Sequence, residues 1–566
     1  MKKKVPFIVA AIFLLIQLTV QIVLAKNDSA TTDEAVHLSA GYTYLVKNDF
    51  RFNPEHPVLV KTMVAAPLLA LSPKIPNDSL YWNIAGNFFY DSWKENRAFG
   101  DDFLYGLGNN ADLLIFLTRL PIMFLTLLLG ISIFFISRKF WGDWAGVVSL
   151  GLFTFDPNFT AHGHLITTDI AISLGFLLSV YTFVNLLKNN KWLNIVMFAF
   201  ALSFAFLVKY TSIILIPTLL ILSLLYIYKQ KIRLRKIVDF WPKLLVIIVI
   251  IWIMIISAYH FNFNLSPNTN SVSSAIKTSN LELTSLDKTP VLESNGPVDK
   301  IYGYSHYFLI PRDYFKGLFM VISHVEAGHS SYFLGMTSKT GWWYYFPVLL
   351  LLKTPILTLI ILSLSLFLYL KSKNKNIYYS LFYLSAPLFL LMSMTSKANL
   401  GLRHIFPIYP ILFVMAGNIF QELKSKKNIL FIFFGILIIQ FILVYPNYIA
   451  YYNQFVGGSG NGYKIAGDSN LDWGQDLKRI KKYIDEKNIK NYYVDYEWGG
   501  DLSLKYYGII NKELPVDLSK KQDFYLIVSS NTLMSKEQYQ IISKNNPTSR
   551  ITNSVFVYNL GEVKDE

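Results

Sequence analysis

The sequence predicts a polytopic α-helical membrane protein that ends in a small α/β domain. The 566 residues are 53% hydrophobic and only 16% charged, whereas an ordinary soluble domain has roughly 25% charged residues. Apolar runs recur along the chain, each near the ~20 residues that span a bilayer. Basic residues gather in short clusters between these runs, which is the pattern that orients membrane helices.

About eleven apolar segments have a length that suits a membrane span. Their predicted cores are residues 5–25, 111–137, 143–160, 170–187, 192–208, 211–228, 241–260, 343–370, 377–394, 405–420 and 428–446. The first run follows three lysines, as a signal peptide would, but it is long for one. The AKNDSA after it is a poor cleavage site, so we expect a retained helix.

The basic clusters predict the orientation of these helices. If the N-terminus is cytoplasmic, the clusters at residues 2–4, 138–139, 188–191, 229–236, 371–375 and 424–427 all fall on the cytoplasmic side. We therefore expect a plasma-membrane protein with two large outer loops, residues 26–110 and 261–342. Residues 1–446 would form the membrane module. Residues 447–566 alternate helix-like and strand-like stretches, so they would form an outer α/β domain.

Composition excludes several classes of function. The absence of cysteine excludes disulfides, thiolate catalysis and cysteine-bound zinc. The net charge of +15 comes from loops between apolar runs, because residues 447–566 contain as many basic as acidic side chains. A nucleic-acid surface would need a basic face on a folded domain. No G-x-x-x-x-G-K-[ST] motif predicts a nucleotide site, and no internal repeat suggests an inverted-repeat transporter.

Acidic residues mark the outer side of the predicted helices. Asp33 and Glu34 follow the first apolar run, and HGHLITTD places His162, His164 and Asp169 at the start of a later one. A carboxylate there could accept a proton from a hydroxyl or hold a metal ion. Loop charges at a water interface explain the Asp-Glu pair equally well, and a helix N-cap explains Asp169.

Cations lie at helix ends on the same side. Lys209 stands between two apolar runs, and Arg403 and His404 precede another. Together they predict a bound anion at the membrane face, and Arg suits phosphate through its planar fork. Lys61 and Lys353 are weaker candidates, because snorkelling to the interface explains them. Carboxylates beside phosphate-binding cations at the outer end of a helix bundle indicate a phosphate-linked substrate with a lipid tail.

Five stretches carry a resemblance to a known family. In chain order they are DEAVHLSAGYTYLVKNDFRFNPEHPVLVK, HGHLITTD, GWWYYFPVLLLLKTP, NLGLRHIFPIYP and GDSNLDWGQDLKRI. They resemble the GT-C membrane glycosyltransferases, in particular dolichyl-phosphate-mannose–protein mannosyltransferases and bacterial lipid-carrier-dependent aminoarabinose transferases. The resemblance extends from Met1 to about Gln475 by motif order. It implies an inverting transfer of a sugar from polyprenyl phosphate to a hydroxyl of a protein, lipid or surface glycan.

The resemblance also implies residue roles. Asp33 matches the catalytic base, Glu34 its orienting or metal-binding neighbour, and Asp169 the second acid of the site. His56 matches a segment that reaches the phosphate of the sugar donor, where its charge would depend on pH. The predicted phosphate ligands are His56, Lys61, Lys209, Arg403 and His404. Some members hold a divalent metal ion near the acids, here Asp33 and Asp169, and others need none. No nucleotide cofactor is implied.

Contacts to the sugar or the acceptor are expected from His164, Asp472 and Trp473. Within SNLDWGQD an aromatic ring stands beside carboxylates, which suits a sugar, although a polar helix start explains the same residues. Two other functions stay open from the sequence, namely a transporter or flippase for a lipid-linked substrate and a glycan-binding scaffold. A scaffold would not require Asp33 and Asp169 to face each other.

Overall fold

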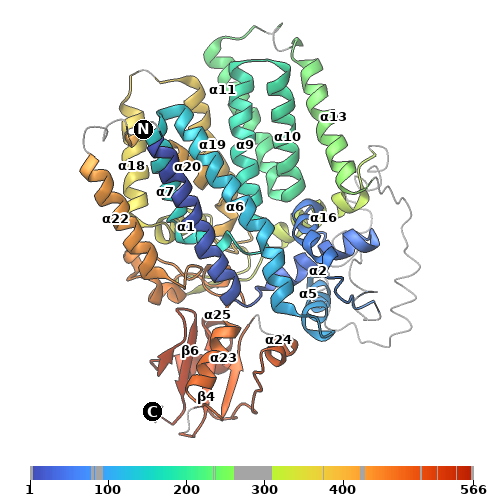
Figure 1. Ribbon diagram of the computed structural model, residues 1–566, viewed down its shortest axis with the longest axis vertical. Coiled ribbons are helices and arrows are strands. Elements are labelled where there is room, and N and C mark those ends of the chain that lie inside the picture. Colours follow the sequence, from blue (N-terminus) through green and yellow to red (C-terminus); the bar gives the residue numbers. More distant parts are fainter. Residues whose placement is uncertain are drawn as a thin grey trace.

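The computed structural model describes residues 4–77, 82, 93–233, 235, 238–260, 309–373, 375–420, 427–497, 500–518, 521–543 and 545–561. Long apolar helices form a bundle, and a four-stranded sheet lies beyond one end of it (Figure 1). The N-terminus lies at the other end, which the predicted orientation requires. Most of the predicted outer loop 261–342 and part of the loop 26–110 lie outside the described residues.

Five described helices are long and apolar enough to cross a membrane. They are α1 (Val5–Asn27), α6 (Ala111–Trp141), α9 (Asp169–Lys188), α11 (Leu215–Gln230, preceded by the 3-10 turn η3, Tyr210–Ile214) and α13 (Trp241–Ala258). A sixth span is counted if the bent pair α17 (Tyr345–Lys353) and α18 (Ile356–Lys371) crosses as one. Shorter helices include α7 (Asp143–Thr154), α8 (Pro157–His162), α10 (Trp192–Val208), α19 (Ile377–Ser393), α20 (Ile408–Ala416) and α22 (Lys427–Val444). Every predicted core is mostly helical, two of them with a break, while the predicted total of eleven spans stays a prediction.

The distribution of polar and apolar side chains confirms that the bundle is built for a bilayer. On α1 the large apolar side chains Ile8, Ile12 and Leu15 are exposed, whereas Gln17 and Gln21 are fully buried. A helix on the surface of a water-soluble protein shows the reverse pattern. Because lipid cannot satisfy amide groups, polar side chains are kept inside the bundle.

Two predicted spans are wrong as single helices. The segment 343–370 bends by 113° between α17 and α18. Pro355 stands at the bend and holds the preceding Thr354 in an extended conformation, as proline does to the residue before it. The segment 143–160 breaks between α7 and α8. There Asp156 accepts hydrogen bonds from the backbone of Asn158 and Phe159, so that it caps the start of α8.

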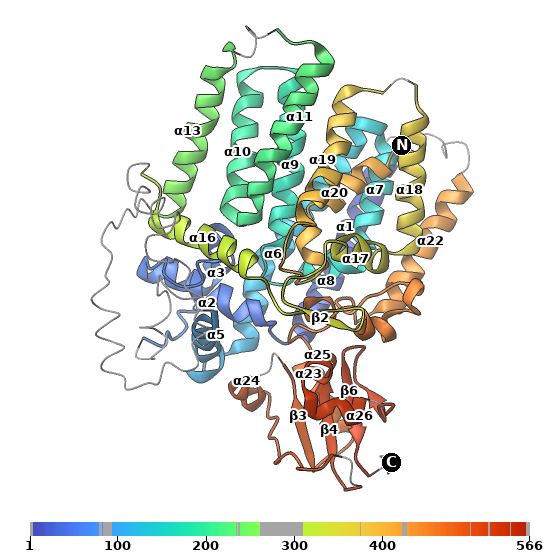
Figure 2. The ribbon, with the colours of Figure 1, turned by 180° about the vertical axis from the view of Figure 1, so that it is seen from behind.

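Short helices fill the end of the bundle nearest the sheet (Figure 2). They are α2 (Thr32–Lys47), α3 (Val58–Ala65, continued by η1, Ala66–Ala70), α5 (Trp93–Asp101, continued by η2, Asp102–Gly106), α16 (Arg312–Ala327) and η6 (Leu402–Ile405). The hairpin β1 (Ser331–Phe333) and β2 (Met336–Ser338) lies with them. Helix α2 begins with a capping box between Thr31 and Glu34, which fixes the direction in which the chain leaves α1.

The C-terminal sheet confirms the predicted α/β domain. Its strands β3 (Tyr492–Asp495), β4 (Tyr525–Ser529), β5 (Ser549–Arg550) and β6 (Val555–Asn559) run in the order β3-β4-β6-β5, and only β3 and β4 are parallel. Side chains alternate between two faces, so that Ile527 packs with α23 (Leu477–Glu486) and Leu526 packs with α25 (Ser530–Ser535) and α26 (Gln540–Ser543). Helix α24 (Asp501–Tyr506) connects β3 toward β4.

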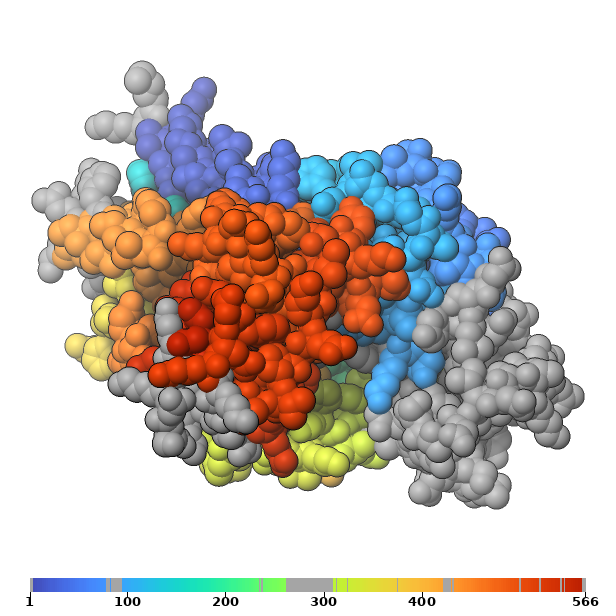
Figure 3. All heavy atoms as spheres, turned by 90° about the horizontal axis from the view of Figure 1, so that it is seen from below, coloured from blue at the N-terminus to red at the C-terminus, as the bar shows by residue number. Residues whose placement is uncertain are grey.

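The border between the two parts differs from the predicted border at residue 447. Tyr448, Tyr452, Leu471 and Trp473 pack in the same hydrophobic core as the membrane helices, whereas the cores of the sheet domain begin with Leu477. The segment between the last membrane helix and α23 therefore belongs to the helical module. Seen from the sheet end, the C-terminal part of the chain lies over the middle of the bundle and beside the N-terminal residues (Figure 3).

Candidate active site

Four charged side chains from distant segments meet at the end of the bundle that faces the sheet. Asp33 lies in the first turn of α2, Asp169 begins α9, Lys209 follows α10, and Arg403 lies in η6. The Nη1 atom of Arg403 lies 3.1 Å from Asp33 and 3.7 Å from Asp169. Lys209 donates a 2.5 Å hydrogen bond to the other oxygen of Asp169. We call these four residues the Arg403 cluster.

The Arg403 cluster is partly open. The side chain of Asp33 is 15% exposed and that of Arg403 10%, whereas Asp169 is fully buried. Among the described residues, one side chain, that of Arg403, donates a hydrogen bond to the Asp33 carboxylate. The Nε atom of Arg403 donates a 3.1 Å hydrogen bond to the hydroxyl of Ser469. The centre of its guanidinium lies over the ring of Trp473, 4.0 Å from the ring centroid. Such cation–π contacts fix the plane of a guanidinium and leave its edge available.

Neutral histidines surround the cluster. The rings of His37 and His56 are in edge contact, and His37 Nδ1 lies 2.8 Å from the carbonyl oxygen of Ile166. Burial holds the pKa values of His56 and His404 well below the ordinary value, with smaller contributions from His37 and Lys209 at His56 and from Lys209 and Arg403 at His404. His56 is therefore uncharged at neutral pH, and its contact with the phosphate of the sugar donor stays a prediction. A neutral imidazole can still donate one hydrogen bond.

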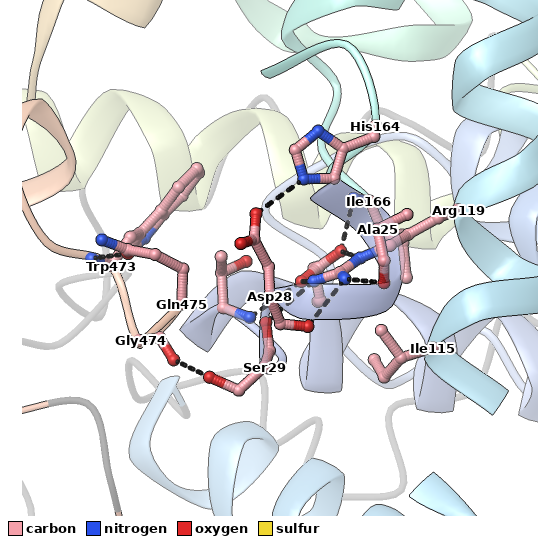
Figure 4. A network of polar contacts seen from close by, with 12 residues as sticks. Ala25, Asp28, Ser29, Ile115, Arg119, His164, Ile166, Trp473, Gly474 and Gln475 are labelled. Carbon is pink, nitrogen blue, oxygen red and sulfur yellow. Dashed lines mark hydrogen bonds and ion pairs between the residues drawn. The ribbon is translucent and has the colours of Figure 1, made fainter. Parts of the chain in front are cut away.

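Glu34, the neighbour of Asp33, is enclosed. Its two oxygens accept bonds of 2.8 and 2.6 Å from Arg119, and they also accept the backbone N–H groups of Thr31 and Ile166. Arg119 also donates to the carbonyl oxygens of Ala25, Asp28 and Ser29 at the end of α1 (Figure 4). Both side chains are fully buried. Burial alone would raise the pKa of Glu34, but Arg119 lowers it below the usual range.

A chain of polar side-chain contacts connects this turn with the sheet domain. His164 lies 3.0 Å from Asp28, Asp28 lies 2.5 Å from Arg479, and Arg479 lies 2.5 Å from Asp476. Figure 4 shows His164 pointing at Asp28, with Ser29 beside Gly474. Burial opposes ionisation of Asp28, but Arg479 and His164 lower its pKa to about 2. His164, predicted to contact the sugar, thus faces a carboxylate of this chain.

The two other predicted sugar contacts are also buried. Asp472 is completely covered, and it accepts a 2.5 Å hydrogen bond from Tyr496 of the sheet domain. Trp473 is 1% exposed, lying between the guanidinium of Arg403 and the ring of His162. Trp473 thus lies against the guanidinium of Arg403, whereas Asp472 bonds to the sheet domain. Direct contact with a sugar stays a prediction for them.

Two lysines do not snorkel as expected. Lys61 is buried and donates to the carbonyl oxygens of Asn53 and His56, which fixes the turn before α3. Burial lowers its pKa to about 7. Lys353 donates to the carbonyl oxygens of Ile449, Tyr451 and Asn470 and thus ties the segment after α22 to α17. Carbonyl oxygens inside the protein replace the water that a snorkelling lysine would reach.

The predicted metal site has little support in the geometry. Among the described residues, no three His, Asp or Glu side chains form a group that could hold an ion. The carboxylates of Asp33 and Asp169 form ion pairs with Arg403 and Lys209. Cations of the protein thus pair with both carboxylates, and a bound metal ion stays a prediction.

Sequence reasoning missed Arg119, Asp28 and Arg479. The signal for Arg119 was present, because a lone arginine inside the apolar run FLTRLPI is costly in a membrane unless it is paired. Asp28 and Arg479 lie more than 400 residues apart in the chain, so only the fold reveals that they meet.

Comparison with known proteins agrees with the resemblance seen in the sequence. Residues 111–259 match the family model described as dolichyl-phosphate-mannose-protein mannosyltransferase. That segment includes Arg119, Asp169 and Lys209, and it confirms the predicted resemblance for helices α6 to α13. No curated protein matches the chain.

Two solved structures are similar over almost the whole length. ArnT from Cupriavidus metallidurans bound to undecaprenyl phosphate shares 11% identity, with 97% of each chain covered and a TM-score of 0.44. The apo state of ArnT from the same organism also shares 11% identity, with 98% of each chain covered and a TM-score of 0.33.

Proposed function

We propose that this protein transfers a sugar from a polyprenyl-phosphate donor to an acceptor hydroxyl at the outer face of the membrane. The Arg403 cluster is the observation that carries the proposal, because two carboxylates and two cations from four distant segments meet there. The family that matches residues 111–259 is described by a dolichyl-phosphate-linked sugar. A sugar linked to a lipid phosphate suits a site at the end of membrane helices beside a folded domain, because its lipid tail can stay in the bilayer while its sugar is in water.

In the proposed reaction the cations bind the phosphate of the sugar donor. The Nη2 atom of Arg403 forms no hydrogen bond with any described side chain or backbone group, so it is available to a phosphate oxygen. Lys209 lies on the far side of Asp169 and adds a second positive charge. Both cations would stabilise the negative charge that collects on the leaving lipid phosphate as the bond to the anomeric carbon breaks.

Asp33 is the proposed general base. It is the more exposed of the two carboxylates that contact Arg403, and it lies in the first turn of α2. When Arg403 binds phosphate, its contact with Asp33 weakens and the carboxylate can accept the proton of the acceptor hydroxyl. The hydroxyl oxygen then attacks the anomeric carbon from the face opposite the phosphate, which inverts the configuration.

The arrangement favours an enzyme over the two alternatives. A transporter places its charges near the middle of the bilayer, at broken helices, whereas Asp33, Asp169, Lys209 and Arg403 lie at helix ends. A glycan-binding scaffold does not predict that Asp33 and Asp169 share one nitrogen of Arg403.

Substitution of Asp33 tests the reaction. In a strain without this protein we expect one polyprenyl-phosphate sugar to accumulate and its glycan product to disappear. Asp33→Asn keeps shape and hydrogen bonding but cannot accept the proton, so the initial rate of transfer in membranes supplied with the accumulated lipid should fall about 10²–10⁴-fold. Asp49→Asn, which removes a carboxylate paired with Arg51 outside the cluster, is the matched control. Near-normal transfer by purified Asp33→Asn would remove Asp33 as the base and leave Asp169 as the next candidate.

Reporter fusions test the side of the membrane. We expect a fusion after Glu566 to report the outer side and a fusion at Arg233, between α11 and α13, to report the cytoplasm. The reason is the set of basic clusters, which are drawn to the cytoplasmic side. Reporters on the same side would contradict both the orientation and an outer active site.

A further inference from the structure

A second pocket lies at the opposite end of the bundle from the Arg403 cluster. It has a volume of about 630 Å³ and is formed by the last third of α6, the first residue of α7 and the middle of α9. Its walls are Ile131, Phe135, Ile136 and Leu178, with Ser132 between them. Its mouth consists of Arg138, Lys139, Asp143 and Tyr181. Tyr181 is twelve residues along α9 from Asp169, or about 18 Å at the rise of an α-helix, so this pocket is separate from the active site.

Lys139 gives the mouth a positive charge. Its ammonium donates a 2.7 Å hydrogen bond to Tyr181 and lies 3.5 Å from the side-chain oxygen of Asn185, and both of these partners are neutral. It forms no ion pair within the described part of the chain. Arg138 is paired with Asp143 at 2.5 Å, and its side chain remains 40% exposed. The mouth therefore carries one net positive charge.

Neighbouring aromatic residues place this mouth at the membrane surface. Trp141 and Trp144 follow Arg138 and Lys139 within two turns, and the exposed Trp192 begins α10, the helix that follows α9 in the chain. Trp and Tyr gather where headgroups meet hydrocarbon. Ile131 precedes Arg138 by seven residues, so the pocket extends about 10 Å along the helix into the acyl region.

We propose that this pocket binds one anionic phospholipid of the cytoplasmic leaflet. The charge at the mouth fits a phosphodiester headgroup, and the apolar walls fit the first part of an acyl chain. A soluble phosphate ion has no apolar part that could cover the apolar walls of the pocket. Because Ile131 and Leu178 lie below the aromatic residues, the walls face hydrocarbon, where the covering molecule is a lipid.

Lipid titration of the purified full-length protein tests the proposal. Native mass spectrometry in mild detergent measures retention of phosphatidylglycerol and of phosphatidylcholine. We expect tighter binding of phosphatidylglycerol by the wild type. Each basic residue near anionic lipid contributes about fivefold in affinity, so Arg138→Gln with Lys139→Gln should weaken phosphatidylglycerol binding about tenfold or more and leave phosphatidylcholine unchanged. Lys229→Gln with Lys371→Gln, which removes two exposed charges from the last turns of α11 and α18, is the matched control and should bind as wild type does.

Two further arms identify the ligand. Leu178→Trp fills the pocket and should reduce retention of both lipids, and its thermal unfolding without lipid shows whether it is folded. If that variant does not fold, the two double variants decide. Inorganic phosphate and polyprenyl phosphate should not displace phosphatidylglycerol. Equal binding of the two lipids, equal effects of the two double variants, or displacement by polyprenyl phosphate would overturn the assignment.

Discussion

Asp33 and Glu34 are adjacent in the sequence, yet each pairs with a different arginine in a different environment. Glu34 and Arg119 are completely buried, and four hydrogen-bond donors reach the carboxylate. Asp33 and Arg403 are both partly exposed, and one donor reaches the carboxylate. The enclosed pair can only hold the chain in place. The open pair can exchange its partner for a ligand, which is the property that a reacting group needs.

The enclosed pair should have the largest effect on folding. Arg119→Ala removes the partner of a buried carboxylate and leaves it uncompensated, which typically costs about 3–5 kcal/mol. It also leaves three carbonyl oxygens at the end of α1 without their donor. We expect little folded protein by size-exclusion chromatography in detergent. Arg51→Ala, which removes an arginine from an exposed pair, is the control. A well-folded Arg119→Ala with reduced transfer would contradict the division into an enclosed and an open pair.

The open pair should affect substrate binding more than stability. Arg403→Ala removes the arginine from a partly exposed pair, and Asp169 keeps its bond to Lys209. We expect an apparent Tm close to that of the wild type and at least a tenfold rise in the apparent KM for the lipid-linked sugar, because truncation of a charged hydrogen-bond donor to a ligand costs about 2–5 kcal/mol. Arg403→Lys should recover part of the loss, since it keeps the charge without the fork. Normal binding of the lipid-linked sugar by Arg403→Ala would disprove the assignment.

The smallest expected effect concerns pH. The pKa of His56 is held well below its ordinary value by burial and then by His37 and Lys209. Above about pH 6.5 the imidazole is neutral in both the folded and the unfolded chain, so stability is complete there. As the pH falls below 6.5, His56 becomes protonated in the unfolded chain but stays neutral in the folded chain. The free energy of unfolding therefore decreases by up to about 1.4 kcal/mol per pH unit.

The apparent Tm between pH 7.5 and 5.5 measures this effect. We expect a smaller decrease for His56→Gln than for the wild type, because the amide does not titrate. His260→Gln, which changes an exposed histidine bonded to Asn48, should decrease as the wild type does. An unchanged slope for His56→Gln would show that this histidine is not the source of the acid sensitivity.

The fold was largely predictable because membrane helices can be recognised in a sequence by their length and apolar composition. Every predicted core is mostly helical, and the sheet domain appears where strand-like stretches alternate with helices. The bend at Pro355 was missed although the proline was visible, because an apolar run reads as one helix whether it is straight or bent. Lys61 and Lys353 were misread for a related reason, since sequence does not show which carbonyl oxygens lie beside an ammonium group.

The sequence predicted which charged residues belong to the site, but it did not predict which of them form ion pairs with one another. Asp33, Asp169, Lys209 and Arg403 were selected as charges at outer helix ends, and the fold brings all four together. The sequence treated Asp33 and Glu34 as a unit. In the structure Arg119, which lies on α6, forms two hydrogen bonds with Glu34 and holds it in a buried position.

The turn between α1 and α2 has a consequence for biosynthesis. The backbone of Ser29 and Thr32 bonds to Gln475 and Trp473, and the Ser29 hydroxyl both donates to Gly474 and accepts from Leu477. Partners 445 residues apart emerge from the ribosome on the order of a minute apart, at about 5–20 residues per second. The first membrane helix is therefore inserted long before the loop that holds Arg403 over Trp473 exists. A nascent chain released early would contain every acidic residue of the Arg403 cluster and still lack the support that aims its arginine.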